Sequence, residues 1–177
     1  MAALVVGTFL TLDGVMQGPG GPDEDRSGEF AHGGWSVGYW DDAMGEIITQ
    51  WTAKADALLF GRRTYGIFAA HWPHVPDADP IGAVLNRVPK HVASTTLKSV
   101  EWNNSALLEG DVPRVVAALR DEPSGEIHVH GSWGLLQMLI EHDLVDEYRL
   151  RQNDGSRVCP RKYETMRSSP TVACSMN

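Results

Sequence analysis

Cysteine is scarce in this sequence of 177 residues, which contains only Cys159 and Cys174, both near its C-terminal end. Without a secretory signal such a pair is more often a pair of free thiols, so we expect no structural disulfide bridge. No apolar run approaches a membrane-spanning length, and the apolar N-terminus lacks a basic leader and is interrupted by Thr8, Thr11 and Asp13. We therefore expect a soluble, cytoplasmic protein that does not bind membranes.

Basic residues are also few, since 15 Lys and Arg stand against 23 Asp and Glu and the formal net charge is −8. This balance argues against nonspecific binding to nucleic acid or to anionic membranes. The sequence has no Gly-x-Ser-x-Gly elbow, Walker phosphate loop or zinc-deaminase motif. His128 and His130 alternate on an expected strand and His71 and His74 lie close together, but neither pair has a third ligand at a zinc spacing. We predict no metal site.

Residues 55–68, ADALLFGRRTYGIF, carry the strongest functional signal. The compact apolar run 57–60 is typical of a buried strand, and a helix is expected to start close after it. The free N–H groups and the dipole of a helix N-terminus attract anions. The N–H donors of an arginine guanidinium are also spaced to bind two phosphate oxygens. A nucleotide phosphate is the predicted ligand of Gly61, Arg62, Arg63 and Thr64. The alternative is a helix that simply begins with two solvated arginines.

Two later segments repeat the pattern of a strand that ends in small or hydroxyl residues. Residues 90–96, KHVASTT, read as a strand that runs into a turn with Ser94 and Thr95. Residues 126–136, EIHVHGSWGLL, read as a strand, a turn and an apolar helix. Ligands collect at the carboxyl ends of strands in open α/β sheets, so three such ends in order favour a nucleotide site.

Strands and helices alternate along the chain, which predicts an α/β fold with a mainly parallel sheet and helices on both faces. We see no repeat or linker and expect a single domain over residues 1–177, with a long Gly- and Pro-rich loop at residues 12–38. The expected strands are residues 3–11, 57–60, 90–93, 127–130 and 147–150. The expected helices are residues 42–54, 64–72, 81–88, 112–120 and 135–142.

The chain resembles the dihydrofolate reductase-like superfamily, specifically bacterial proteins similar to the C-terminal reductase domain of the bifunctional riboflavin-biosynthesis enzyme. The segments that carry the resemblance are VVGTFLTLDGVMQ (5–17), LLFGRRTY (58–65), AST (93–95) and IHVHGSWGLLQML (127–139). It covers roughly residues 3–150 and implies a three-layer α/β/α fold. The end of the chain departs from the family, because residues 151–177 form an atypical polar and basic tail in which only residues 171–174 read as a weak strand.

The resemblance implies a nicotinamide cofactor, and arginines at the adenosine phosphate favour NADPH over NADH. Arg62 and Arg63 would bind that phosphate, and Ser94 and Thr95 would flank the adenosine. Gly131, Ser132 and Gly134 would approach the pyrophosphate, while Thr8 and Phe9 would meet the nicotinamide. For Phe9, plain core packing is the alternative.

Hydride transfer also needs a proton source near the substrate, so carboxylates are the candidates for catalysis. Asp41 and Asp42 open the helix after the long loop, where dihydrofolate reductases place an acidic residue on the pterin. Helix capping is the alternative role for both. Asp13 is a third candidate or a turn residue, and Trp35 and Trp40 would cover a flat heterocycle or belong to the core.

These residues predict an NADPH-dependent reductase of a small heterocyclic substrate, with the aminouracil ribosyl-phosphate of riboflavin synthesis as the nearest precedent. One alternative is a noncatalytic nucleotide-binding module that keeps the fold without turnover. Another is a redox protein that uses flavin. The resemblance further implies a homodimer.

Overall fold

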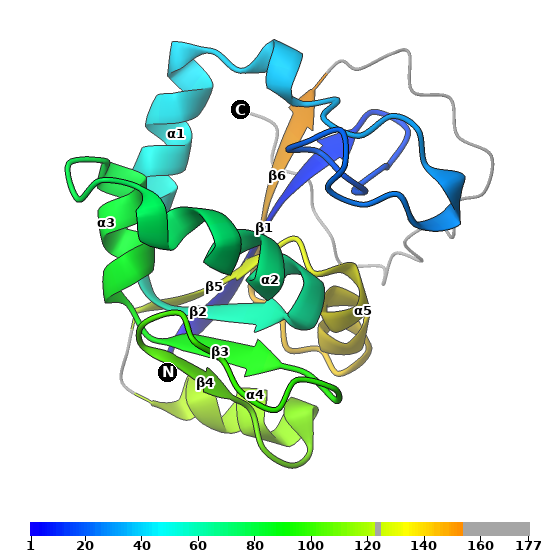
Figure 1. Ribbon diagram of the computed structural model, residues 1–177. Helices are drawn as coiled ribbons and strands as arrows, with labels where there is room; N and C mark the ends of the chain where they lie inside the picture. Colours follow the sequence, from blue (N-terminus) through cyan, green and yellow to red (C-terminus); the bar gives the residue numbers. More distant parts are fainter. Residues whose placement is uncertain (123–124, 154–177) are drawn as a thin grey trace.

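A computed structural model describes residues 1–122 and 125–153 of the chain, which form six strands and five α-helices (Figure 1). The strands are β1 (Ala3–Thr11), β2 (Ala55–Gly61), β3 (Lys90–Ala93), β4 (Ser105–Leu107), β5 (Glu126–His130) and β6 (Glu147–Asn153). The helices are α1 (Asp42–Thr52), α2 (Arg62–His71), α3 (Pro80–Arg87), α4 (Val112–Asp121) and α5 (Trp133–Glu141). Three short 3-10 helices are η1 (Ser27–Glu29), η2 (Val37–Tyr39) and η3 (Trp72–His74).

The strands form one sheet in the order β4-β3-β2-β5-β1-β6. All five neighbouring pairs are parallel, so their carboxyl ends lie along the same edge. The predicted alternation of strands and helices and the predicted parallel sheet are confirmed.

Helices cover both faces of this sheet, because successive strand residues point to opposite faces. On one face, Leu4, Val6, Leu59 and Val129 pack with residues of α4 and α5 around Leu136. On the other face, Leu58, Phe60 and Val92 pack with residues of α2 and α3. Helix α1 contacts α3 and lies on this second side, so the sheet is the middle layer of three (Figure 1).

Aspartate caps begin three of the helices where the sequence places polar residues before apolar periodicity. Asp41 accepts a hydrogen bond from the N–H of Met44, and Asp111 accepts one from Arg114. Asp79 accepts from both Ile81 and Gly82. Each cap satisfies N–H groups that the first helical turn leaves without partners.

Several predicted boundaries were wrong. Helix α2 begins at Arg62 rather than residue 64, because it starts directly after β2. Helix α5 begins at Trp133 rather than residue 135, because only Gly131 and Ser132 separate it from β5. Strand β4 was not predicted, since three residues are too short to show periodicity. The last strand was predicted to end at residue 150, but β6 runs to Asn153 and takes the first residues of the atypical tail into the sheet.

The long loop is more ordered than a structureless connection, because η1 lies within it and η2 begins at its end. The weak strand predicted at residues 171–174 and the two cysteines lie outside the described residues.

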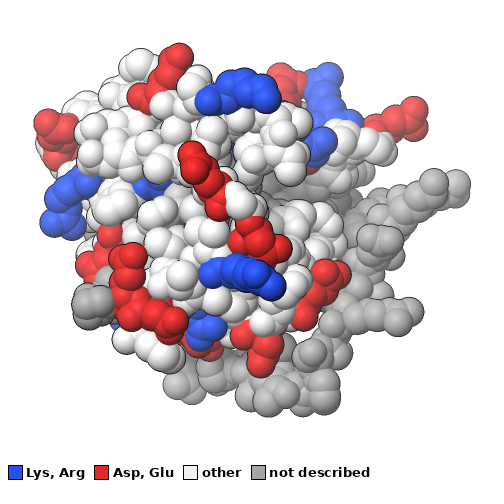
Figure 2. Space-filling view, turned by 90° about the horizontal axis from the view of Figure 1, so that it is seen from below, with Lys and Arg blue, Asp and Glu red and all other residues white. Residues whose placement is uncertain are grey.

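Charged side chains of both signs are interspersed on the face of the molecule seen in Figure 2. Over residues 1–122 and 125–153, no helix has the length and apolar character that crossing a membrane requires. The same residues contain no group of three or more His, Cys, Asp or Glu side chains arranged to hold a metal ion.

Candidate active site

The turns after β2 and β5 are joined directly at the carboxyl edge of the sheet. The N–H of Gly61 donates to Ser132 Oγ at 2.9 Å, and Ser132 Oγ donates to the carbonyl of His130 at 3.0 Å. Gly131 and Ser132 both have positive φ, 51° and 58°. A Cβ on Gly61 would lie 3.4 Å from Ser132, so glycine permits this close approach.

This junction brings the starts of α2 and α5 together. Neither Gly61 nor Ser132 caps its helix with a side-chain hydrogen bond, so the first N–H groups of both helices are not used by caps. Thr64 Oγ1 would lie 3.9 Å from a Cβ on Gly131, which brings the threonine of one turn beside the glycine of the other. Gly61, Thr64, Gly131 and Ser132 therefore lie together, as the nucleotide hypothesis requires. Gly134 is in the first turn of α5.

The two arginines of α2 are exposed, and one already has a partner. Arg63 Nη1 lies 3.6 Å from Asp25 Oδ2 in the long loop. Two hydrogen bonds from Ser27 and the charge of Arg63 favour the ionised Asp25, so its pKa is lower than usual although burial opposes this. A phosphate bound to Arg63 would compete with the Asp25 carboxylate.

The third predicted turn follows β3, next to β2. Ala93 pairs with Gly61, so Ser94 lies just beyond the end of β2. Ser94 Oγ accepts hydrogen bonds from the N–H groups of Thr96 (3.1 Å) and Leu97 (2.9 Å), which shapes the turn. Thr95 is exposed in the same turn.

Thr8 and Phe9 were expected to meet the same nicotinamide, but adjacent strand residues point to opposite faces. Thr8 is buried, and its hydroxyl donates to the carbonyl of Phe9 at 3.1 Å. The Phe9 ring lies 6.4 Å from the ring of Trp40 and 5.0 Å from the guanidinium carbon of Arg151. Only one of the two side chains can face a given ligand.

The structure places the two tryptophan candidates and Asp41 in different environments. Trp35 is buried and donates from Nε1 to the carbonyl of Gln17 at 2.8 Å, so it holds the long loop. Trp40 is exposed and lies beside Phe9, where a flat ligand would reach it. Asp41 is the N-cap of α1, which was the alternative to a catalytic role for this residue.

Of the other carboxylates, Asp13 accepts a hydrogen bond from Thr11 Oγ1 in the turn after β1. Asp42 is exposed in the first turn of α1. Within the described part of the chain, its carboxylate has no hydrogen bond or ion pair.

Sequence reasoning missed a charged cluster on the sheet face that α1 covers. Arg149 of β6 binds Glu126 of β5 through Nη1 (2.7 Å) and Nη2 (2.9 Å), and binds Glu147 through Nε (2.8 Å). His128 Nε2 lies 2.7 Å from Glu126 Oε2. The segments EIHVH and EYRLR place ionisable residues at every second position, and this alternation was the available signal.

The Arg149 guanidinium lowers the pKa of Glu126 to about 2, mainly through its hydrogen bonds. Burial lowers the pKa of His128, whereas the hydrogen bond of its ring to Glu126 favours the charged form. The cluster is therefore one cation bound to two carboxylates, next to a histidine whose charged form is disfavoured.

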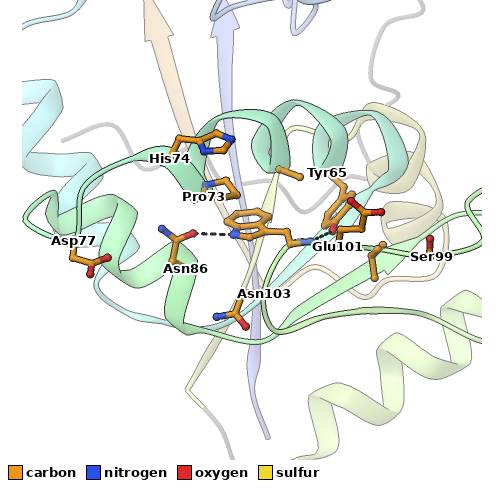
Figure 3. A pocket seen from close by; sticks show the side chains of 11 residues that line it. Tyr65, Pro73, His74, Asp77, Asn86, Ser99, Glu101 and Asn103 are labelled. Carbon is orange, nitrogen blue, oxygen red and sulfur yellow. Dashed lines mark hydrogen bonds between the residues drawn. The ribbon is translucent and has the colours of Figure 1, made fainter.

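A depression of about 610 Å³ lies between α2, η3, α3 and residues 99–103 (Figure 3). Its polar groups hold these segments to one another. Trp102 donates from Nε1 to Asn86 Oδ1 at 2.8 Å and from its backbone N–H to the Tyr65 hydroxyl at 3.0 Å, and Asn86 Nδ2 donates to the carbonyl of Trp72 at 3.0 Å. We assign these contacts to folding and not to ligand binding.

Comparison with known proteins agrees with this arrangement. The family model described as "RibD C-terminal domain" matches residues 2–153. A protein of Bacillus subtilis (strain 168), described as "Uncharacterized protein YyaP", is 25% identical over 150 residues, which cover 83% of this chain and 72% of that protein. The parallel sheet with helices on both faces is the dihydrofolate reductase-like α/β fold that the resemblance implied. The chain belongs to the family of RibD C-terminal domains.

Proposed function

We propose that this protein is an NADPH-dependent reductase that transfers hydride to a small heterocyclic substrate, as in the reductase step of riboflavin biosynthesis. The contact between Gly61 and Ser132 is the observation that carries the proposal. It brings two helix starts together at the carboxyl edge of a parallel sheet, where nucleotides bind in α/β proteins. The family match supports the same reaction class.

The residues at this edge fit a dinucleotide phosphate. N–H groups of α2 and α5 that the N-cap residues Gly61 and Ser132 leave uncapped would bind the pyrophosphate oxygens, and Arg62 and Arg63 would bind the adenosine phosphate. NADPH, when bound, supplies the hydride. The chain's own part is to fix this cofactor against the substrate, because hydride transfer requires a close and defined approach of the two carbons.

Asp42 is our candidate for the proton source, because the carboxylates of Asp41 and Asp13 are engaged by Met44 and Thr11. Asp42→Asn removes the acid but keeps the size of the side chain. Reduction should slow at least about a hundredfold if Asp42 supplies the proton, whereas NADPH affinity should stay unchanged. Equal turnover by the variant would contradict the role.

Cofactor binding tests the proposal directly. Purified protein is titrated with NADPH and with NADH, following the fluorescence of its six tryptophans. We expect NADPH to bind more tightly, and the Arg62→Ala/Arg63→Ala variant to lose that preference. Arg114→Ala is the control, since Arg114 is an exposed arginine of α4. Equal affinity for both cofactors, or an unchanged preference in the double variant, would contradict NADPH specificity.

Turnover separates a reductase from a noncatalytic nucleotide-binding module. Oxidation of NADPH is followed with pterins and aminopyrimidines, including the aminouracil ribosyl-phosphate. We expect turnover with at least one of these heterocycles. NADPH binding without turnover across the panel would support the module instead, and flavin that copurifies with the protein would support a flavin-dependent reaction.

A further inference from the structure

Ionisable side chains follow one face of β5 and β6 from one end of the strands to the other. On β5 they are Glu126, His128 and His130, and on β6 they are Glu147, Arg149 and Arg151. Strand β1 lies between the two and presents Val5, Gly7 and Phe9 to the same face.

The acidic members of this row lie at the amino ends of the strands. Both carboxylates bind the guanidinium of Arg149, Glu126 at Nη1 and Nη2 and Glu147 at Nε. Among the described residues, no carboxylate forms an ion pair with Arg151 or His130. Positive charge without a carboxylate partner therefore lies at the carboxyl end of the row, which is the end where ligands bind in such sheets.

Arg151 and His130 converge over Gly7. A carbon placed as a Cβ on Gly7 would lie 3.5 Å from Arg151 Nη2, 4.0 Å from Arg151 Nη1 and 4.0 Å from His130 Nδ1. Both side chains thus lie within van der Waals distance of a methyl group at residue 7. The φ of Gly7 is not positive, so the backbone does not require glycine here; the absent side chain lets the two polar groups lie close to β1.

Aromatic rings hold the guanidinium of Arg151. Its central carbon lies 5.0 Å from the ring centroid of Phe9 and 5.2 Å from that of Trp51 in α1. Such contacts orient an arginine without consuming its N–H donors.

Two nitrogens of this pair, Arg151 Nε and His130 Nε2, are buried and have no hydrogen-bond partner among residues 1–122 and 125–153. Burial and the nearby Arg149 lower the pKa of Arg151 to about 10. Burial, with Arg151 and His128, lowers the pKa of His130 to about 3. At neutral pH a charged arginine therefore lies beside a neutral histidine, and buried polar atoms without partners are costly in a folded protein.

We propose that Arg151 and His130 form a binding site over Gly7 for a planar anionic group of the substrate, a carboxylate or the deprotonated edge of a heterocycle. The guanidinium fork binds two acceptor atoms of such a group, and His130 contributes a neutral ring nitrogen beside it. That this ligand is the substrate rests on the proposed reductase function, whereas the anion site itself does not. Arg151 then determines specificity by favouring acidic heterocycles over neutral ones.

The test compares matched acidic and neutral ligands by isothermal titration calorimetry without NADPH. The pairs are pterin-6-carboxylate with pterin, and orotate with uracil. We expect the acid of at least one pair to bind at least about tenfold more tightly than its neutral partner, as for hydrogen bonds to a charged group. Arg151→Gln should abolish that preference, and the control Arg114→Gln should keep it.

Gly7→Ala is the second variant, because its methyl group fills the point that both side chains contact, and the extra contacts of 3.5 to 4.0 Å are ordinary ones. Gly7→Ala should weaken the binding of the acidic ligand and leave the binding of its neutral partner unchanged. This variant tests the site even if Arg151→Gln fails to fold. Equal affinities within each pair, binding of neither compound, or a preference that survives in Gly7→Ala would each overturn the anion site. NADPH titration of the same preparations reports separately on the proposed function, so the two can fail independently.

Discussion

Asp41 shows how a single residue that suits catalysis can be used for folding. Its carboxylate was one of the candidates for proton transfer, and it accepts the hydrogen bond that begins α1, from Met44 at 2.8 Å. Aspartate, asparagine and serine all fill this position well, whereas alanine does not.

We predict that Asp41→Ala lowers the free energy of unfolding by about 1 kcal/mol, the usual cost of a lost N-cap. Asp41→Asn should keep the stability of the original protein, because an amide oxygen also accepts the bond. Urea denaturation of the two variants measures this difference. A reductase activity that disappears in both variants, at unchanged stability, would return Asp41 to the catalytic candidates.

His130 makes stability depend on pH. Its folded pKa is about 3, mainly because of burial, whereas an unfolded histidine titrates near 6.5. The unfolded chain therefore binds more protons than the folded chain between these values, and the free energy of unfolding falls as the pH drops from about 6.5 toward 3.

We predict a slope of up to about 1.4 kcal/mol per pH unit from this histidine. The lowered pKa of His128 adds to it, and Glu126 adds a further loss below about pH 4.5 because its folded pKa is about 2. Urea midpoints between pH 7 and pH 4 measure the slope. His130→Phe should make it shallower, and an identical slope in that variant would show that His130 is not the cause.

At the scale of secondary-structure elements, Lys90 joins the start of β3 to the segments on either side of it. Its side chain is fully buried, and Nζ donates to the carbonyls of Asn86 (3.2 Å), Val88 (2.9 Å) and Asn103 (2.8 Å). The ammonium also lies 4.5 Å from the ring centroid of Trp102. One lysine thus donates hydrogen bonds to three carbonyls, two at the end of α3 and one before β4.

We predict that Lys90→Met lowers the free energy of unfolding by roughly 2 kcal/mol or more, because it removes the donor from buried carbonyl groups. Lys98→Met is the matched control, since Lys98 is exposed, and it should change stability by less than about 0.5 kcal/mol. Chemical denaturation of both variants checks the comparison. Equal stability of the two would mean that water replaces the lysine at those carbonyls.

At the scale of the whole molecule, the proposed cofactor would bridge elements that are distant in the chain, since β2, α2, β5 and α5 all reach the junction of Gly61 and Ser132. A ligand that binds only the folded state stabilises it by mass action.

We predict that NADPH at about a hundred times its dissociation constant raises the free energy of unfolding by about 2.7 kcal/mol. Thermal denaturation with NADPH, with NADH at the same concentration and without cofactor measures the effect. The melting temperature should rise most with NADPH. No shift with either cofactor would contradict the nucleotide site, and the homodimer stays a separate prediction for sedimentation analysis.

Much of the fold was predictable because it depends on short segments. The apolar run before Gly61 and the periodic helices were recognised from patterns that a few residues carry. Strand β4 was missed because Ser105–Leu107 is too short to show a pattern. The candidate site was predictable only in part, because turns at strand ends are local features whereas the charged cluster is not.

The sequence by itself determined the alternation of strands and helices, the helix caps, and the small residues at the ends of β2, β3 and β5. These features depend on local periodicity and turn chemistry. Only the tertiary structure decided which distant residues meet. It joins Gly61 to Ser132, ties Glu126 to Arg149 across β1, and brings Arg151 over Gly7. The physical reason is that the order of the strands in the sheet sets these contacts, and that order results from the packing of both faces together rather than from any one segment.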